Sequence, residues 1–253
     1  MNKHVITRWR AAAIHLGLSA LPVCAVLSTL YFFWYPGALF DAAGGLLLFL
    51  VIAGVTVASG PLLTLIIFRQ GKRGLGFDLA AIALLQLAAL SYGTWILYQS
   101  RPVWIAFVVD RFELVRANEV PAEEREKAKP PYDELPLSGP RVIGVRKPKD
   151  PNEQFRVAMS ALQGHDLQAY PQYYVPYADV AREVEGAAKP VAQLSRFNPD
   201  AGASIAALPA KFGVKEEDMG FLPMRAGKKD LTVLVGRKTG RYLGTSGLKP
   251  WQY

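Results

Sequence analysis

The residue types that most often carry chemistry are scarce in this sequence. Its 253 residues include one cysteine and three histidines. The single Cys24 cannot form a disulfide, a CxxC redox pair or a thiolate metal site within one chain. His4, His15 and His165 lack the HExxH or HxxxH spacing that brings two imidazoles to one metal ion. We therefore expect no metal site.

Motifs for nucleophilic catalysis or nucleotide binding are missing as well. The sequence has no GxSxG element, and the glycines of residues 71–76 (GKRGLG) lack the GxGxxG and GK[ST] spacings, so they are interpreted as turn formers. Ser160, His165 and Asp166 have the residue types of a catalytic triad. However, adjacent histidine and aspartate side chains cannot easily line up behind a serine. We expect no catalytic residues and no bound cofactor.

Two polar side chains inside apolar sequence are better candidates for a role. His15 and Gln86 lie about one and two helical turns from the ends of their apolar runs. A hydrogen bond between the first and third runs, or exposure of His15 at the membrane interface, is the simpler interpretation. A polar contact with the helix of a partner protein is the alternative. Gly54 and Ala58, four residues apart, would let helix backbones approach closely, either within this chain or in a partner.

Three long uncharged runs must position these side chains. Residues 11–34, 45–68 and 79–98 carry no formal charge if His15 is neutral, although the whole chain has a net charge of +8. As helices these runs would reach roughly 30–36 Å, which matches a hydrocarbon core of about 30 Å. Aromatic residues close the first and third runs, as in interfacial belts. We predict a membrane domain, residues 1–100, with three transmembrane helices.

The short connections predict how these helices are oriented. The N-terminus and the loop 69–78 each carry three basic residues, whereas the connection 35–44 carries none. The positive-inside rule then puts the first two segments in the cytoplasm and residues 101–253 outside, which is the periplasm for a bacterial inner membrane. The first run is too long for a signal peptide and no A-x-A-like site follows it, so we expect an uncleaved anchor.

Residues 101–253 contain 23 of the 29 basic and 19 of the 21 acidic residues, and they are interpreted as a small α+β domain. Asp150 is a strong helix N-cap, and Phe155, Met159 and Leu162 then form one apolar face. Other expected elements are strands at 103–109 and 112–115, a short exposed helix within 121–129, an alanine-rich helix up to about Lys211, and a hairpin of 231–235 and 241–244 with its turn at 236–240.

The segment 170–177 (YPQYYVPY) is the part of this domain best suited to recognition. Its four tyrosines and two prolines favour an extended loop, and tyrosine supplies amphipathic contact area. Tyr173 and Tyr174 are therefore candidate partner contacts, with core packing as the alternative. No basic cluster with interleaved aromatic residues indicates nucleic-acid binding, so the expected surroundings are membrane lipid and a protein partner.

Several stretches together have a distinctive pattern. They are residues 34–45 (WYPGALFDAAGG), 60–93 (beginning GPLLTL and containing GKRGLGFDLA), 101–120 (RPVWIAFVVDRFELVRANEV), 135–145 (LPLSGPRVIGV) and 231–244 (LTVLVGRKTGRYLG). A chain with these stretches resembles the TfpX/TfpZ type IV pilin accessory proteins. The resemblance covers almost the full length and brings no catalytic residues.

The resemblance implies a chaperone-like inner-membrane protein that supports the stability of the major type IV pilin, pilus assembly and twitching motility. His15 could then meet the glutamate near the cytoplasmic end of a pilin helix, although a bond within this chain is simpler. Two other classes stay open, a membrane-anchored envelope enzyme acting on lipid or glycan and a general assembly scaffold. The first would need a polar constellation near the membrane face, and only scattered residues of that kind occur.

Overall fold

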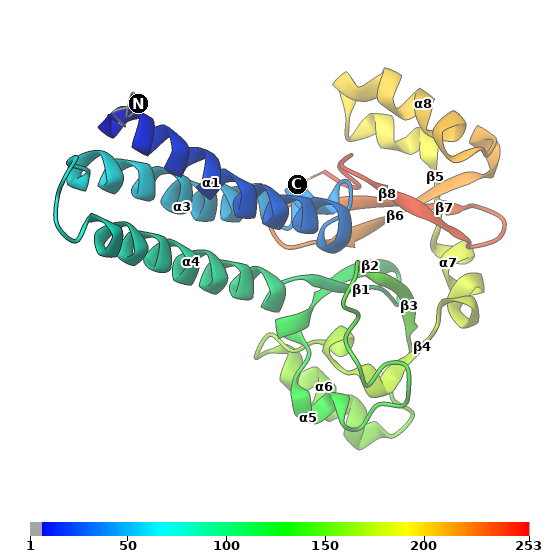
Figure 1. Ribbon diagram of the computed structural model, residues 1–253. Coiled ribbons are helices and arrows are strands. Elements are labelled where there is room, and N and C mark those ends of the chain that lie inside the picture. The colour runs from blue at the N-terminus through cyan, green and yellow to red at the C-terminus, as the bar shows by residue number, and fades with distance from the viewer. Residues whose placement is uncertain (1–6, 253) are drawn as a thin grey trace. The chain divides into compact units, whose positions relative to one another are not determined.

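The computed structural model describes residues 7–252, with the side chain of Leu48 left out (Figure 1). Lys3 and His4 lie outside the described residues. The chain forms two compact units. One consists of Met1–Phe32 and Gly44–Gln99, and the other consists of Phe33–Ala43 and Ser100–Tyr253.

The first unit is built from the three long helices that the uncharged runs predict. Helix α1 (Arg8–Thr29) continues as a π-helical segment, Leu30–Trp34, and is followed by α3 (Gly45–Ile67) and α4 (Leu75–Gln99). Within this unit α3 packs against both α1 and α4 (Figure 1). By length and composition all three are able to cross a membrane. The prediction of three long apolar helices is confirmed.

The connection between the first two long helices is part of the second unit. It contains the short helix α2 (Leu39–Ala42), which ends before Gly44, whose φ of +74° favours glycine. Leu39 and Ala42 are buried in the core of the sheet domain. The Tyr35 hydroxyl donates to the backbone oxygen of Ser100 at 3.0 Å. The sequence analysis assigned this connection to a membrane domain of residues 1–100, whereas the structure groups it with the later residues because its apolar side chains complete their core.

An eight-stranded mixed sheet forms the centre of the second unit. The strand order is β4-β3-β1-β2-β6-β7-β8, and β5 pairs with β6. The β1–β3 and β2–β6 pairs are parallel and the other pairs are antiparallel. The strands are β1 (Pro102–Val108), β2 (Arg111–Arg116), β3 (Arg141–Val145), β4 (Tyr174–Pro176), β5 (Lys189–Pro190), β6 (Met219–Arg225), β7 (Leu231–Gly236) and β8 (Tyr242–Ser246).

Short helices cover this sheet. They are α5 (Ala122–Arg125), α6 (Pro151–Ala161), α7 (Ala181–Ala187) and α8 (Gly202–Phe212), with 3-10 turns at Ala117–Glu119, Leu167–Ala169, Pro171–Tyr173, Tyr177–Val180, Val191–Arg196, Pro199–Ala201 and Glu216–Asp218. The Asp150 cap is present, because its carboxylate accepts the backbone N–H of Asn152 at 3.1 Å. The α+β prediction is confirmed for this unit. The expected extended loop at 170–177 is wrong, since a 3-10 turn and β4 occupy it.

The buried side chains of β1 alternate between the two faces of the sheet, as the pleat requires. Ile105 and Phe107 face a core that also contains Leu39, whereas Trp104 and Ala106 face a core that contains Val157 of α6. All seven residues of β1 are buried. A strand covered on both faces explains its nearly continuous apolar sequence.

Candidate partner-binding site

His15 connects all three helices of the first unit through a buried polar cluster. Its Nδ1 lies 2.6 Å from the Thr64 hydroxyl of α3, and its Nε2 lies 2.6 Å from Oε1 of Gln86 on α4. The amide nitrogen of Gln86 donates to the backbone oxygen of Thr56 at 2.5 Å and to Ser19 at 3.3 Å. Each polar atom of the Gln86 side chain therefore has a partner within the chain.

The orientation of Gln86 determines the tautomer of His15. The backbone oxygen of Thr56 can only accept, so the amide nitrogen of Gln86 must face it and Oε1 must face the imidazole. Nε2 of His15 must then carry the hydrogen, and Nδ1 is free to accept the Thr64 hydroxyl. A neutral imidazole satisfies every member of the cluster.

These bonds decide between the two interpretations of His15. Both ring nitrogens are engaged inside the unit, and Gln86 is only 7% exposed. The structure thus contains the helix–helix hydrogen bond that was the simpler interpretation. It leaves no ring nitrogen for a partner carboxylate without first breaking a bond, which disfavours His15 and Gln86 as direct partner contacts.

Gly60 allows Gln86 to enter this cluster. A Cβ atom at Gly60 would collide with the amide group of Gln86. Gly93 of α4 serves a similar contact, because a Cβ there would lie 2.9 Å from Cδ1 of Ile52. Close approach of α3 and α4 therefore depends on Gly60 and Gly93.

Gly54 and Ala58 are on a different side of α3. Both are exposed, and a Cβ at Gly54 would meet nothing within 4 Å. The structure therefore does not use Gly54 and Ala58 for packing within the chain. Their side of α3 is open to lipid or to another helix.

A shallow groove lies next to the polar cluster in the same unit. It has a volume of about 190 Å³ and is lined by residues of α1 and α4, with Thr56 of α3 contributing. His15, Ser19 and Gln86 supply its polar part, while the remaining lining is apolar, namely Leu18, Pro22, Ala83, Leu87 and Leu90. The groove suits an apolar chain or helix more than a charged ligand.

The structure separates the two tyrosines that the sequence analysis grouped. Tyr174 is only 6% exposed and its ring packs edge-on against Trp104 and Tyr132, so it is a core residue with no surface for a partner. Burial raises the pKa of its hydroxyl well above the ordinary value. Tyr173 is half-buried, and its hydroxyl donates to the carboxylate of Glu153 at 2.6 Å.

Glu124 is the centre of a polar network around Tyr173 that sequence reasoning missed. Its carboxylate accepts hydrogen bonds from Lys127 at 2.8 Å, Gln172 at 2.6 Å and Arg156 at 3.2 Å. Burial alone would raise the pKa of Glu124, but the bonds from Lys127 and Gln172 and the charge of Arg156 outweigh it and lower the pKa. The sequence indicated only a short exposed helix within 121–129, because Arg156 and Gln172, two of the partners of Glu124, are distant along the chain.

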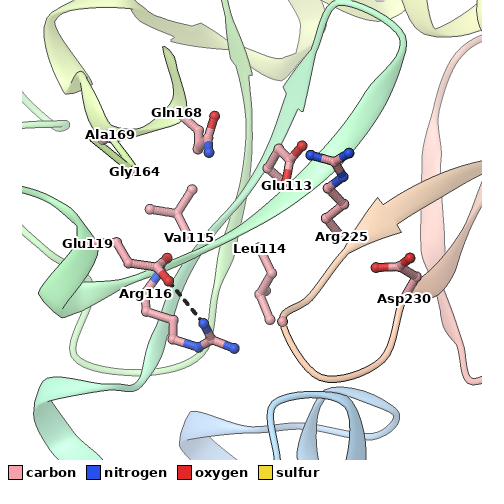
Figure 2. Close-up of a pocket in the computed structure, with 11 residues that line it drawn as sticks. Glu113, Leu114, Val115, Arg116, Glu119, Gly164, Gln168, Ala169, Arg225 and Asp230 are labelled. Atoms are coloured by element: carbon pink, nitrogen blue, oxygen red, sulfur yellow. Dashed lines mark hydrogen bonds and ion pairs between the residues drawn. The ribbon is translucent and has the colours of Figure 1, made fainter. Parts of the chain in front are cut away.

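A charged cavity of about 380 Å³ opens where β2 and β6 separate (Figure 2). The two strands pair only at Phe112–Met224 and Glu113–Arg225. Beyond this point the lining includes carboxylates and guanidinium groups, and Arg116 binds Glu119 at 2.9 Å (Figure 2).

Glu113 is the most buried charge of this cavity, at 7% exposure. Burial raises the pKa of Glu113, and the Arg111 guanidinium, 2.7 Å away, opposes that rise. The lining offers hydrogen bonds and charge of both signs. Across residues 7–252, no three His, Cys, Asp or Glu side chains converge to hold a metal ion.

Known proteins similar to this chain share one description. A fimbrial assembly protein of serogroup E1 from Dichelobacter nodosus is 30% identical over 218 residues, which is 85% of each chain. The serogroup I protein of the same organism is 32% identical over 219 residues, again 85% of each chain. A protein of serogroups C1 and C2 is 35% identical over 122 residues, 47% of this chain and 92% of its own length. No family model and no solved structure matches the chain.

Proposed function

This chain belongs to the fimbrial assembly proteins, and on that premise we propose that it is an accessory protein of type IV pilus biogenesis that holds the pilin subunit before assembly. The observation that carries the proposal is the shared identity over 85% of both long relatives, which spans both structural units. The relatives' names supply the assembly role. Holding the pilin, and thereby supporting twitching motility, is the finer part of the proposal.

The proposed mode of action is binding without covalent chemistry. A pilin subunit awaiting assembly would present an apolar helix in the inner membrane and a globular head in the periplasm. The open side of α3 around Gly54 and Ala58 suits the helix, because small residues let a second backbone approach closely. The largely apolar groove of about 190 Å³ between α1 and α4 offers a separate contact surface for a helix or an acyl chain.

The orientation that fits this role has the N-terminus in the cytoplasm and the sheet domain in the periplasm. Support comes from the basic loop around Lys72 and from the connection 35–44, which has no lysine or arginine. Phosphatase fusions after Lys72 and after Leu137 test it. Activity is expected only at the second site, and activity at the first would exclude this orientation.

Deletion of the gene tests the function itself. We expect lower pilin abundance, fewer surface pili and loss of twitching, all restored by the wild-type gene. Normal values for all three would contradict the proposal. A general assembly scaffold predicts a different outcome, in which pilin abundance in the membrane is normal and only surface pili are lost.

A further inference from the structure

The charged cavity of about 380 Å³ lies where strand β2 continues past the end of β6. The last pair between the two strands is Glu113 with Arg225, the final residue of β6. Strand β2 continues through Leu114, Val115 and Arg116, which all line the cavity (Figure 2). Three residues of a strand span about 10 Å. Within the described part of the chain, this stretch has a strand partner on its β1 side only.

Backbone groups of β2 face this gap in the sheet. The N–H of Ala117 donates to the backbone oxygen of Arg101 at 2.9 Å, on the β1 side. Because backbone groups alternate between the two edges of a strand, those of Leu114 and Arg116 are on the β6 side. The N–H of Arg116 donates to the carboxylate of Glu119 at 2.8 Å. The backbone oxygen of Leu114 is therefore the acceptor that an incoming N–H would meet.

A second acceptor comes to the cavity from a distant part of the chain. The side-chain oxygen of Gln168 is buried and has no hydrogen-bond partner among residues 7–252. Its 3-10 turn, Leu167–Ala169, is fixed by the Asp166 carboxylate, which accepts the N–H of Leu167 at 2.7 Å. A buried oxygen without a partner is costly, and in folded proteins water or a ligand usually supplies the donor. The cavity thus calls for a ligand with N–H groups.

The charge still available at the cavity is positive. Its three carboxylates have partners in the chain, namely Arg111 for Glu113 at 2.7 Å, Arg116 for Glu119 at 2.9 Å, and the indole N–H of Trp251 for Asp230 at 2.9 Å. Arg225 acts on Glu113 only at longer range, and Lys228 and Lys229 follow it in an exposed turn. Among residues 7–252, none of these three cations forms an ion pair. A carboxylate on the ligand would supply the missing partner.

Arg116 holds the wall of the cavity in place. Its Nη2 donates to the backbone oxygen of Ala226 at 3.0 Å, which ties the turn after β6 to β2. A Cβ at Gly227 would lie 2.2 Å from the same nitrogen, and the φ of +98° at this position also favours glycine. The cavity is therefore preformed, which lowers the cost of binding a ligand.

We propose that this cavity binds an extended peptide segment with an acidic side chain, which adds a short strand beside β2 where β6 ends. Its N–H groups donate to the backbone oxygen of Leu114 and to Gln168, and its carboxylate binds Arg225. A small free acid satisfies only Arg225, whereas a peptide satisfies the charge and both acceptors. In strand addition of this kind, backbone hydrogen bonds supply affinity and side-chain contacts supply specificity. The proposal concerns the sheet domain alone and does not rest on the holding of a pilin helix.

Fluorescence polarisation with the full-length chain in phosphatidylcholine nanodiscs tests this proposal. The probe is a fluorescein-labelled, amidated peptide of five residues, with threonine and valine on each side of a central glutamate. Arg225→Gln should weaken its binding about tenfold, through the loss of one charge-assisted hydrogen bond. The matched control is Arg237→Gln, at an exposed arginine beyond the other end of the β6–β7 pair, and it should leave binding unchanged.

Two further ligands distinguish a strand from a free acid. The same peptide with methylated backbone nitrogens keeps its charge but cannot donate, so it should bind about tenfold more weakly. Glutarate, which has carboxylates without a peptide backbone, should not displace the probe at equal concentration. No binding of the glutamate peptide, equal binding of its methylated form, displacement by glutarate, or equal losses in the two arginine variants would each overturn the proposal.

Discussion

Helices α4 and α6 both direct polar side chains inward beside apolar ones and expose large apolar side chains, yet they belong to units of different kinds. In α4, Gln86 is buried while the neighbouring Leu84 and Leu85 are 70% and 65% exposed, as expected for a helix surrounded by lipid. In α6, Glu153 and Arg156 face the domain while Phe155 is exposed. Most of the apolar residues elsewhere in the sheet domain are buried in its cores.

The difference lies in what holds each helix. The buried side of α4 is held by neutral hydrogen bonds and by close approach at Gly60 and Gly93, where no larger residue fits. The inner side of α6 is held by the ion pair of Arg156 with Glu124, by the hydrogen bond from the Tyr173 hydroxyl to the Glu153 carboxylate, and by Val157. We therefore infer that α4 depends on steric fit, whereas α6 depends on charge and hence on pH.

The largest effect is expected at Gly60. Gly60→Leu drives a side chain into the amide of Gln86, so both overpacking and loss of the polar cluster follow, at a cost of roughly 2–4 kcal/mol in the free energy of unfolding. Gly54→Leu, the same change on the open side of α3, should cost less than about 1 kcal/mol. Unfolding of the full chain in bicelles measures both. Equal losses would show that α3 and α4 do not meet as described.

The next effect concerns the coupling of His15 to Gln86. A double-mutant cycle with His15→Leu and Gln86→Leu should give an interaction energy of about 1 kcal/mol, in the range of interhelical hydrogen bonds in membranes. The same cycle with Cys24→Ala in place of His15→Leu should give none. If the two single substitutions lower the free energy of unfolding additively, His15 and Gln86 do not interact and the cluster is refuted.

A smaller and pH-dependent effect is expected at Glu124. Because its folded-state pKa is lowered, its contribution to stability is complete above the pKa of the unfolded chain, about 4.5, and is lost as pH falls through the lower folded value. Glu124→Gln should therefore destabilise the sheet domain at pH 7 and flatten its loss of stability in acid. Thermal unfolding of the full chain at pH 3 to 7 provides the measurement. An unchanged acid profile would rule out this role.

The smallest expected changes in the free energy of unfolding are those that distinguish the exposed side of α6 from its buried side. Phe155→Ser and Leu162→Ser remove exposed groups and should change stability by less than about 0.5 kcal/mol. Val157→Ala, on the buried side, should cost roughly 1–2 kcal/mol because it leaves a cavity. Unfolding of the chain in detergent compares the three variants. Larger losses at Phe155 or Leu162 than at Val157 would mean that the apolar face is packed.

Much of this organisation is predictable from sequence because it depends on local patterns. Uncharged runs long enough to cross the hydrocarbon core of a bilayer identify the long helices, and Asp150 with Pro151 identifies the start of α6. The parallel strands β3 and β6 were missed because their partners are β1 and β2, distant in the chain. Their short sequences, with glycine or proline inside, give no clear alternation.

The candidate site was less predictable from the sequence. Helical spacing shows which residues share one face of a helix, but it does not show whether another element packs on that face. Phe155, Met159 and Leu162 have the spacing of a buried stripe, but the bonds of Glu153 with Tyr173 and of Arg156 with Glu124 turn the helix the other way. Gly54 and Ala58 have the spacing of a packed interface, yet the chain uses Gly60 instead. These choices depend on residues that are far apart in the sequence.

Cross-linking to pilin in the membrane most directly tests whether this fimbrial assembly protein holds the pilin helix. A photoreactive amino acid replaces Ala58 on the open side of α3, or Gly17 on α1, which is also exposed. The account predicts an adduct with the major pilin from position 58, lost when Gly54→Leu blocks close approach, and little or none from position 17. No pilin adduct at position 58, in cells that contain normal amounts of both proteins, would contradict it.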